Sequence, residues 1–392
     1  MADRLVDTLE RTLAARAADG LARRRRVVEA RAGARVVVDG RELVGFASND
    51  YLGLSTDPAL AEAAAAAARR WGVGAAASHL LGGHHAPHEA LESELAAWVA
   101  PCEGARAVTF SSGYLANLAI VSTLADRGTE VFADRLNHAC LNDGALLARA
   151  RLVRYPHRDA AALERRLAAS RARRRLIATD AVFSMDGDVA PLAALLALAE
   201  RHDAWLVVDD AHAFGVLGRG RGTLAELHLA SPRIVLMGTL GKAAGVAGAF
   251  VAAHPSVIEA IAQTARPCVF TTAAPPMLAE TLRASLGLVR DGERRRARLA
   301  RHVARFRAEA DGLPWTMTGS TTPIQPLVVG GNREALDLAR SLEERGLFVP
   351  AIRPPTVPDG TARLRVSFSA AHDDDDVGAL LHALHEVARG WG

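Results

Sequence analysis

This protein is a chain of 392 residues, half of them hydrophobic, which is enough to bury one large core and a smaller one. Its 47 basic and 44 acidic residues leave a formal net charge of only +3. The arginine runs have no interleaved aromatic residues, so we expect no nucleic-acid surface. No stretch is apolar enough for a signal peptide or a membrane span, and three cysteines in no motif fit a reducing compartment, so we expect a cytoplasmic protein.

The chain opens on a predicted arm, residues 1–45. Apolar side chains recur at helical spacing from Leu5 to Leu13, which predicts one helix over roughly the first 30 residues. Val36–Leu43 is predicted to form a β-hairpin, because Asp39–Gly40 favours a tight two-residue turn.

Residues 46–285 are predicted to form a large domain in which short β-branched runs alternate with Ala/Leu-rich helical stretches. Several runs are almost entirely apolar, as expected of strands covered on both faces. This alternation indicates an α/β fold with a mostly parallel, doubly wound sheet. The predicted strands are Ala107–Ser111, Glu130–Ala133, Arg151–Tyr155, Leu176–Thr179, Trp205–Asp209, Ile234–Met237 and Ala249–Ala253.

Residues 286–392 are predicted to form a smaller C-terminal α+β domain. A long helical region begins at Pro275–Pro276 and reaches about Leu313. Four acidic residues, Asp373–Asp376, suit the N-terminus of the last helix better than they suit a metal site. The predicted strands of this domain are residues 324–329, 348–352 and 364–368.

Lys242 is the only lysine in the chain, so the other 46 basic residues are arginine. Mutational bias toward Arg codons explains the loss of lysine from solvated surfaces. A site that needs a primary amine does not tolerate the exchange, because guanidinium stays protonated and only an amine forms a Schiff base. The lone lysine is therefore a candidate for chemistry.

Polar residues follow several predicted strands, where ligands bind in open parallel sheets. Ser112–Gly113 leads from a strand into a helix, which suits a phosphate but is also ordinary turn chemistry. Asp209 and His212 follow an apolar strand, and a buried Asp there needs a cationic partner such as a pyridinium nitrogen. The alternatives are a helix cap for Asp210 and a metal pair for Asp with His.

Asp209-x-x-His212, followed by Gly-Thr-Leu-Gly-Lys242, resembles the α-oxoamine synthases, which are pyridoxal-phosphate enzymes of the aminotransferase type I fold. The similarity extends over nearly the whole chain and includes residues 46–54, 134–139 and 182–188. This resemblance implies that the large domain binds the cofactor.

The resemblance also implies residue roles in catalysis. Lys242 would carry pyridoxal 5'-phosphate as a Schiff base and remove the substrate's α-proton. Asp209 would pair with the ring nitrogen, His212 with the phenolic oxygen, and His138 would stack on the ring. The other implied cofactor contacts are Gly113, Tyr114, Ser184, Thr239, Thr271 and Thr272, the last two toward the partner subunit's phosphate in a homodimer with shared active sites.

Residues 351–358, residues 360–365 and Gly20–Leu21 resemble the family members that make a biotin precursor. Those members condense L-alanine with a pimeloyl thioester and release carbon dioxide. By this resemblance Arg353 would bind the amino acid carboxylate, since Arg forms bidentate pairs. Thr356 would lie beside it, and His138 could donate to the same carboxylate. Arg23 would contact substrate, with the register among the four arginines of residues 23–26 left open by one residue. The thioester carrier, acyl carrier protein or coenzyme A, stays open.

Two other functions fit the same residues. A sister α-oxoamine synthase would use glycine or serine with another acyl thioester and share every cofactor residue. A non-catalytic scaffold would keep the fold and need no lysine side chain. The chain also departs from its family, since Asp180 stands where many relatives have Glu, and Ala75–Ala77 replace a stretch that is usually rich in Gly.

Four histidines, at positions 79, 84, 85 and 88, lie close together in the sequence. His84 and His88 have the helical spacing of metal ligands. Gly82–Gly83 and Pro87 are expected to break the helix that would align them. We therefore predict no metal site from the sequence.

Overall fold

The computed structural model describes residues 4–391, which form two compact units. The first unit comprises the chain up to Asn49, Met185–Asp188 and the chain from Arg298 onward. The second comprises Asp50–Ser184 and Val189–Ala297. Our predicted division was an arm at 1–45, a large domain at 46–285 and a small domain at 286–392. The compact units instead group the arm with the C-terminal segment, because a strand of the arm pairs with a strand near residue 347.

The second unit is built on a seven-stranded sheet in the order β4-β10-β9-β8-β7-β5-β6. Five neighbouring strands run parallel, and β10 is antiparallel to both β4 and β9. The predicted mostly parallel sheet is therefore confirmed. The strands are β4 (Arg106–Phe110), β5 (Thr129–Asp134), β6 (Arg151–Tyr155), β7 (Arg174–Asp180), β8 (Ala204–Asp209), β9 (Ile234–Thr239) and β10 (Ala249–Ala253).

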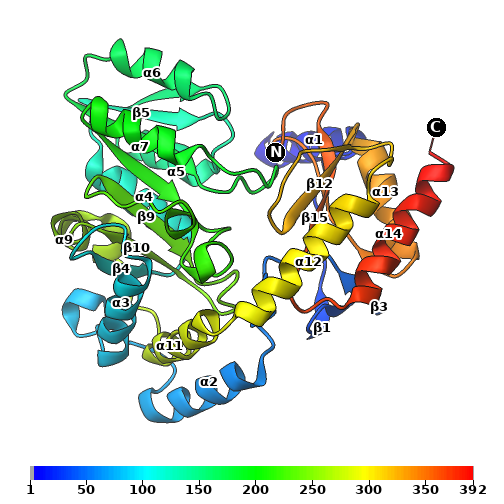
Figure 1. The fold of residues 1–392 in the computed structure, drawn as a ribbon, viewed down its shortest axis with the longest axis horizontal. Helices are drawn as coiled ribbons and strands as arrows, with labels where there is room; N and C mark the ends of the chain where they lie inside the picture. Colours follow the sequence, from blue (N-terminus) through cyan, green and yellow to red (C-terminus); the bar gives the residue numbers. More distant parts are fainter. Residues whose placement is uncertain (1–3, 392) are drawn as a thin grey trace. The chain divides into compact units, whose positions relative to one another are not determined.

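Helices flank this sheet (Figure 1), and every residue of β9 and β10 is buried, which explains why these strands are apolar throughout. Gly144 allows the close packing of α5 on α4, because a Cβ there would lie 2.8 Å from Val121. The helices of this unit are α2 (Pro58–Trp71), η1 (His79–Leu81), α3 (Ala86–Val99), α4 (Gly113–Leu124), α5 (Ala139–Leu147), α6 (Ala160–Ala168), α7 (Leu192–Arg201), η2 (Gly218–Gly220), α8 (Thr223–Glu226), α9 (Pro255–Thr264), α10 (Arg266–Val269) and α11 (Pro276–Arg290).

The first unit holds two four-stranded sheets, β1-β2-β3-β13 and β11-β12-β15-β14. Its strands are β1 (Val28–Ala32), β2 (Arg35–Val38), β3 (Arg41–Gly45), β11 (Thr316–Met317), β12 (Ile324–Gly330), β13 (Leu347–Phe348), β14 (Ala351–Ile352) and β15 (Ala362–Ser367). Its helices are α1 (Arg4–Ala18), α13 (Asn332–Glu344) and α14 (Asp374–Arg389), with most of α12 (Glu293–Glu309).

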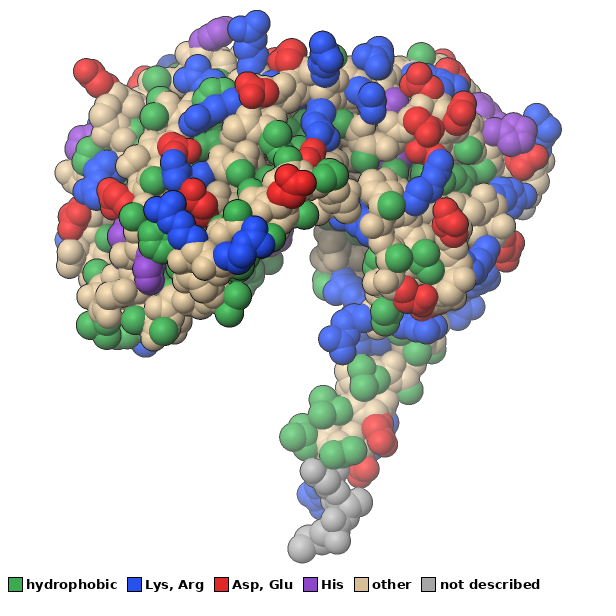
Figure 2. Space-filling view, turned by 90° about the horizontal axis from the view of Figure 1, so that it is seen from below, with side chains coloured by type: hydrophobic (Ala, Val, Ile, Leu, Met, Phe, Trp, Pro, Cys, Tyr) green, Lys and Arg blue, Asp and Glu red, His purple; other side chains and the backbone are tan. Residues whose placement is uncertain are grey.

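The N-terminal helix is shorter than predicted. α1 ends at Ala18, Gly20 adopts a positive φ of 68°, and β1 forms where we expected helix. Apolar side chains at helical spacing stop at Leu13, and the arginines at 23–26 have no such spacing, so the pattern does not support a longer helix. α1 extends away from the rest of the first unit (Figure 2), and its apolar side chains are exposed.

The predicted turn at Asp39–Gly40 is confirmed. Both residues have positive φ angles, 51° and 74°, as a type I′ turn requires, and β2 pairs with β3 on either side. The next strand in this sheet is β13, which runs parallel to β3 with Leu347 opposite Val44. Pairing across some three hundred residues cannot be read from local patterns.

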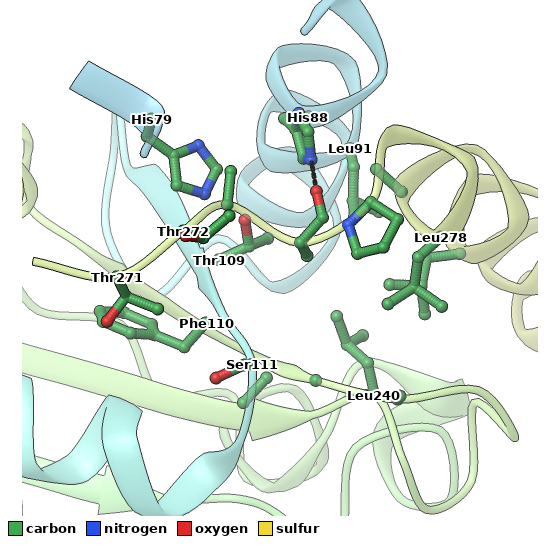
Figure 3. A pocket seen from close by; sticks show the side chains of 18 of the residues that line it. His79, His88, Leu91, Thr109, Phe110, Ser111, Leu240, Thr271, Thr272 and Leu278 are labelled. Atoms are coloured by element: carbon green, nitrogen blue, oxygen red, sulfur yellow. Dashed lines mark hydrogen bonds between the residues drawn. The ribbon is translucent and has the colours of Figure 1, made fainter. Parts of the chain in front are cut away.

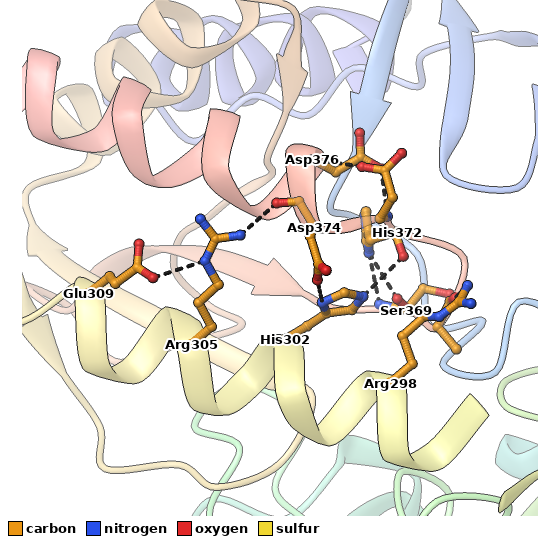
Figure 4. A network of polar contacts seen from close by, with 10 residues as sticks. Arg298, His302, Arg305, Glu309, Ser369, His372, Asp374 and Asp376 are labelled. Atoms are coloured by element: carbon orange, nitrogen blue, oxygen red, sulfur yellow. Dashed lines mark hydrogen bonds and ion pairs between the residues drawn. The ribbon is translucent and has the colours of Figure 1, made fainter. Parts of the chain in front are cut away.

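A polar network joins α12 to the segment that starts α14 (Figure 4). His302 is buried and its Nε2 lies 3.0 Å from the carbonyl oxygen of His372. Arg305 donates to the carbonyl of Asp374 at 2.6 Å, and His372 Nε2 lies 3.1 Å from the carbonyl of Gly45. Burial lowers the pKa of both imidazoles, so they act here as neutral hydrogen-bonding groups.

Charges of both signs are mixed on one face of the molecule. Figure 2 shows arginine side chains interspersed with acidic side chains on one face of the molecule. Among residues 4–391, no helix is both long and apolar enough to cross a bilayer.

The acidic start of α14 makes a testable contribution to stability. Asp373 caps the helix by accepting from the backbone N–H of Asp376 at 2.8 Å, and this bond lowers the pKa of Asp373. We expect Asp373→Ala to reduce the free energy of unfolding by about 1 kcal/mol near neutral pH. Because the folded-state pKa is depressed, the contribution is present above the ordinary Asp pKa and is lost as the pH falls through the folded value.

Urea unfolding at about pH 7 and about pH 3 measures this effect. Asp375→Ala is the matched control, since Asp375 is exposed in the same turn. Equal midpoints for the two variants at neutral pH would contradict the cap assignment.

Candidate active site

The strand ends of the second unit bring the predicted polar residues to one edge of the sheet. β7 and β8 pair so that Asp180 lies opposite Asp209, each the last residue of its strand. Asp209 in turn lies opposite Met237 of β9, and Lys242 follows that strand. His138 is the N-cap of α5, shortly after β5. The sheet therefore gathers residues that are distant in sequence.

A cavity of about 180 Å³ lies at this edge. It contains eight of the residues predicted from the sequence: Gly113, Tyr114, His138, Ser184, Asp209, His212, Thr239 and Lys242. Cys140, Asp180, Ala211 and Met237 complete its lining.

Lys242 is joined to a buried tyrosine through His212. Lys242 Nζ lies 3.0 Å from His212 Nε2, and His212 Nδ1 lies 2.6 Å from the hydroxyl of Tyr51. The proton of a neutral imidazole sits on either nitrogen, so a charged Lys242 donates to Nε2 and a neutral one accepts from it. The three groups therefore form one continuous hydrogen-bonded chain.

Asp209 is held by donors from two directions. Asn117 Nδ2 donates to Oδ2 at 2.7 Å, and the backbone N–H of Ala211 donates to Oδ1 at 3.0 Å. Asn117 is fully buried in the first turns of α4, and its Nδ2 also lies 3.1 Å from Cys140 Sγ. Its Oδ1 is buried without a hydrogen-bond partner. One amide therefore links the Asp209 carboxylate to the start of α5.

Cys140 sets the state of the His138 ring. Its Sγ lies 2.8 Å from His138 Nδ1, and burial together with the charge of Asp209 raises the pKa of the thiol. The thiol is therefore protonated and donates to Nδ1, which leaves the ring proton on Nε2. The backbone N–H of His138 donates to the Asp180 carboxylate at 3.1 Å.

Two further carboxyl groups are buried next to Asp209. Burial and the charge of Asp209 raise the pKa of Asp180 well above its ordinary value. Burial also raises the pKa of Asp210 to about 7. Asp210 accepts from the backbone N–H of Thr223 at 3.1 Å and from its hydroxyl, so it belongs to the start of α8 and not to the cavity. Of the roles that the sequence left open for Asp210, a helix cap comes close to the observed one, since Asp210 accepts from the first residue of α8.

The start of α4 offers an open backbone next to Thr239. Ser112 is the N-cap and its Oγ accepts from the N–H of Leu115 at 3.3 Å. A Cβ on Gly113 would lie 2.8 Å from Thr239 Cγ2, so a larger residue could not be accommodated without movement. Tyr114 is partly exposed and its hydroxyl donates to Asp143 at 2.5 Å.

Thr271 and Thr272 lie elsewhere in the second unit. They line another cavity, of about 300 Å³, together with His79, His88 and Leu240 (Figure 3). Within the described residues they are not among those that line the cavity of Lys242.

Arg23, Arg353 and Thr356 form a separate cluster in the first unit. Arg23 donates to the Thr356 hydroxyl at 2.8 Å, while Arg353 donates to the carbonyls of Gly20 and Ala22. Arg353 Nε is buried without a hydrogen-bond partner. Burial and the charge of Arg23 lower the pKa of Arg353. Two adjacent guanidinium groups with an unused donor are suited to an anion.

Sequence reasoning gave no role to Tyr51, Asn117 or Cys140. Tyr51 reaches His212 across 161 residues, which no local pattern predicts. Asn117 carried a usable signal, since it is a polar residue on a helix that directly follows the Ser112–Gly113 strand end.

The sequence matches the aminotransferase class I and II family over residues 41–384. It is 58% identical to the 8-amino-7-oxononanoate synthase of Aromatoleum aromaticum over 384 residues, which are 98% of this chain and 99% of that protein. It is 57% identical to the 8-amino-7-oxononanoate synthase of Thiobacillus denitrificans, with 99% of this chain and 100% of that protein covered.

Solved structures agree with this assignment. A serine palmitoyltransferase from S. paucimobilis with bound PLP-myriocin aldimine superposes with a TM-score of 0.92 at 29% identity, covering 99% of each chain. The 8-amino-7-oxononanoate synthase of Francisella tularensis superposes with a TM-score of 0.76 at 30% identity, covering 89% of this chain and 98% of that one. The chain belongs to the aminotransferase class I and II family and, within it, to the α-oxoamine synthases.

Buried Asp210 should make stability depend on pH. Its folded-state pKa of about 7 exceeds the ordinary value, so the unfolded chain ionises first as the pH rises. Asp210 therefore costs stability increasingly between about pH 4 and pH 7. We expect the free energy of unfolding of the parent protein to fall by on the order of 2 kcal/mol between about pH 5 and pH 7 because of this group. The Asp210→Asn variant, which cannot ionise at this position, should not show that fall.

The measurement is the free energy of unfolding in urea across this pH range, for the parent protein and two variants. Asp203→Asn, at an exposed aspartate, should leave the parent's slope unchanged. Parallel curves for the parent and Asp210→Asn would show that Asp210 does not titrate in this range.

Proposed function

We propose that this protein condenses L-alanine with a pimeloyl thioester to form 8-amino-7-oxononanoate, the reaction of biotin biosynthesis that its relatives' name describes. The observation that carries the proposal is the 57–58% identity to enzymes of that name over nearly the full chain. A carbon–carbon bond forms between the alanine Cα and the acyl carbon, and the C–S bond of the thioester breaks. The products are the amino ketone, a free thiol and carbon dioxide from the alanine carboxylate.

The cavity at the strand ends has the chemistry that pyridoxal phosphate needs. It combines a primary amine, a buried carboxylate and a helix start with open backbone, which suit an aldehyde, a pyridine nitrogen and a phosphate respectively. The clash that any Cβ on Gly113 would make with Thr239 requires glycine here, so no side chain covers this first residue of the helix. When bound, the cofactor supplies an electrophilic carbon and a ring that delocalises negative charge.

We assign Lys242 to hold the cofactor and then to accept the proton from the alanine Cα at Nζ. A lysine acts as a base only when its amine is neutral, and its proton needs an outlet. His212 and the Tyr51 hydroxyl provide one, at 3.0 Å and 2.6 Å along the path. His212 is also assigned to the cofactor's phenolic oxygen.

We assign Asp209 to hold the proton on the ring nitrogen. Asn117 and the Ala211 N–H fix the carboxylate, so its position does not depend on the cofactor. His138 is assigned to the ring face and to the substrate carboxylate, toward which the protonated Nε2 is a donor.

The phosphate is assigned to the start of α4 and its neighbours. Gly113 and Tyr114 supply the first residues of this helix, whose N-terminus carries a partial positive charge. Ser184 and Thr239 contribute hydroxyl groups from the same cavity.

We assign Thr271 and Thr272 to the phosphate of a second copy of the chain, in a homodimer with shared sites. Exposed apolar side chains near these residues in sequence and in space support this pairing. Leu81 and Phe270 are 81% and 72% exposed, and Leu80 is exposed as well. Such side chains are costly to leave in water, and a partner subunit would cover them. The three unpaired, buried cysteines support a location in the cytoplasm.

Arg353 is assigned to the alanine carboxylate, with Thr356 beside it and Arg23 as a further substrate contact. The buried, unpaired Nε of Arg353 supports this role. A sister synthase would share all cofactor residues, so the amino acid and acyl donor must be tested directly. Acyl carrier protein and coenzyme A are both candidate carriers of the acyl group.

The reaction is tested by incubating the purified protein with L-alanine and pimeloyl thioester on either carrier. We expect 8-amino-7-oxononanoate, thiol and carbon dioxide in equal amounts, and less product with glycine or serine. Because Lys242 is the only lysine, reduction with borohydride should attach the cofactor to one side chain, identified by mass spectrometry. Lys242→Arg keeps the charge without a nucleophile and should show neither product nor attachment.

Product formation by Lys242→Arg would refute the mechanism. Efficient turnover of another amino acid and thioester, with none of alanine and pimeloyl thioester, would move the protein to a sister reaction.

The carboxylate assignment predicts a change in substrate affinity. We expect Arg353→Ala to raise KM for L-alanine by at least about 10-fold, and Arg353→Lys to recover little, because lysine lacks the bidentate fork. Arg333→Ala is the matched control, since Arg333 also donates to a backbone carbonyl near the end of α1, that of Ala18 at 2.8 Å. Equal changes in KM for Arg353→Ala and Arg333→Ala would indicate that Arg353 only holds the N-terminal segment in place and does not bind the substrate.

A further inference from the structure

Imidazole rings gather around the start of α3, outside the cavity of Lys242 and beside the segment that carries Thr271 and Thr272. The ring centroids of His79 and His84 are 5.1 Å apart, those of His79 and His88 5.1 Å, and those of His84 and His88 5.6 Å. The sequence argued against such a cluster because Gly82–Gly83 and Pro87 interrupt a helix. The interruption is real, but it does not separate the rings.

A reversal of the chain brings the rings together. η1 ends at Leu81, the next residue, Gly82, has a φ of 95°, and the N–H of Gly83 donates to the carbonyl of Ser78 at 2.9 Å. A Cβ on Gly83 would lie 2.1 Å from the carbonyl oxygen of Ala77, so this close turn requires glycine. Pro87 then lies in the first turn of α3, where it is tolerated.

The hydrogen bonds fix which nitrogens are available. His88 Nε2 lies 2.8 Å from the carbonyl oxygen of Ala274 (Figure 3), and a carbonyl only accepts, so Nε2 carries the proton. His84 Nε2 lies 3.1 Å from the Glu89 carboxylate. With Nε2 protonated in both rings, each Nδ1 holds a lone pair. His84 Nδ1 lies 2.8 Å from His79 Nδ1.

We propose that His79, His84 and His88 form a binding site for one divalent transition-metal ion of the kind that prefers imidazole, such as Zn²⁺, Ni²⁺ or Co²⁺. One ring nitrogen of each residue lies within 4.8 Å of the other two. Tetrahedral zinc with Zn–N bonds of about 2.0–2.1 Å places its ligand nitrogens about 3.3 Å apart. His79 and His84 therefore need to separate by roughly half an ångström.

The surroundings of the rings resemble those of metal-binding histidines. Such a histidine donates its second N–H to a carboxylate or a carbonyl, which orients the ring. His84 has this arrangement with Glu89, and His88 has it with Ala274. Burial and the neighbouring rings lower the pKa of His79 to about 4, so its imidazole is neutral near pH 7.

Helix capping explains only part of the cluster. His88 Nδ1 accepts from the backbone N–H of His85 at 3.0 Å, as in a capping box, so metal binding replaces that bond. Capping involves neither His79 nor His84, whose facing nitrogens are the centre of the site. A competing arrangement uses His84 with the carboxylates of Glu89 and Glu92. Glu89 is 69% exposed and Glu92 already accepts two bonds from Thr109, which favours the imidazole set.

A metal here would act as a clamp on the segment that carries Thr271 and Thr272. Ser78 forms a bridge with Thr272, and the N–H of Ala273 donates to the carbonyl of Ala77 at 2.9 Å. With His88 bound to Ala274, the metal ligands touch this segment from both sides of the turn. We therefore expect metal binding to raise the melting temperature of the protein.

The test is a calorimetric titration of the cofactor-loaded protein with Zn²⁺ after removal of metals by a chelator. We expect one ion per chain at this site. His84→Ala and His79→Ala should each weaken binding by more than about 100-fold, and Glu89→Gln, which removes only the orienting carboxylate, by about 10-fold. Co²⁺ added to the same samples reports coordination through its visible absorption, so the result does not depend on enzyme activity.

His382→Ala is the matched control. His382 is exposed on α14 and lies 3.2 Å from Glu386, as His84 lies beside Glu89, so this variant should bind Zn²⁺ as the parent does. Unchanged affinity in both His79→Ala and His84→Ala would overturn the site. Loss of binding in Glu92→Gln with full binding in His79→Ala would overturn it too, in favour of the carboxylate arrangement.

Discussion

Two carboxyl groups, those of Asp180 and Asp209, lie buried side by side at the ends of neighbouring strands, and the surrounding segments supply the donors that these groups need. A buried carboxylate is stable only when donors or cations surround it, since its desolvation costs several kcal/mol. The donors come from backbone N–H groups at His138 and Ala211 and from the Asn117 amide. Hydrogen bonds to these two carboxyl groups thus help to place the starts of α4 and α5.

The need for donors around Asp209 also explains how hydrogen bonds connect the residues inside the site. The amide of Asn117 is shared between Asp209 and Cys140, and the Cys140 thiol in turn directs the ring of His138. A change at any of these groups would therefore be felt at the others, because each has its hydrogen bonds fixed by its neighbour.

The sheet and the main site residues could be predicted because their signals are local. An apolar run that ends in a carboxylate, as at Asp209, predicts a strand and its carboxyl end. Neighbouring parallel strands have their carboxyl ends at the same edge of the sheet. Tyr51 and the pairing of β3 with β13 could not be predicted, since both depend on contacts between distant segments. The close approach of the histidine rings was not predicted for another reason. The spacing of His84 and His88 predicts neighbouring side chains only within a continuous helix. In the structure a turn at Gly83 brings the rings close without one.

Lys242 has a consequence beyond its place in the site. Acyl thioesters react slowly with exposed amines, so an enzyme that binds them is at risk of acylation on its own surface lysines. This chain has no such lysine, because its 46 other basic residues are arginines. Apart from the α-amino group, the only amine available to a stray thioester is the one inside the cavity. A chain composed in this way has no exposed lysine side chain that a stray thioester could acylate.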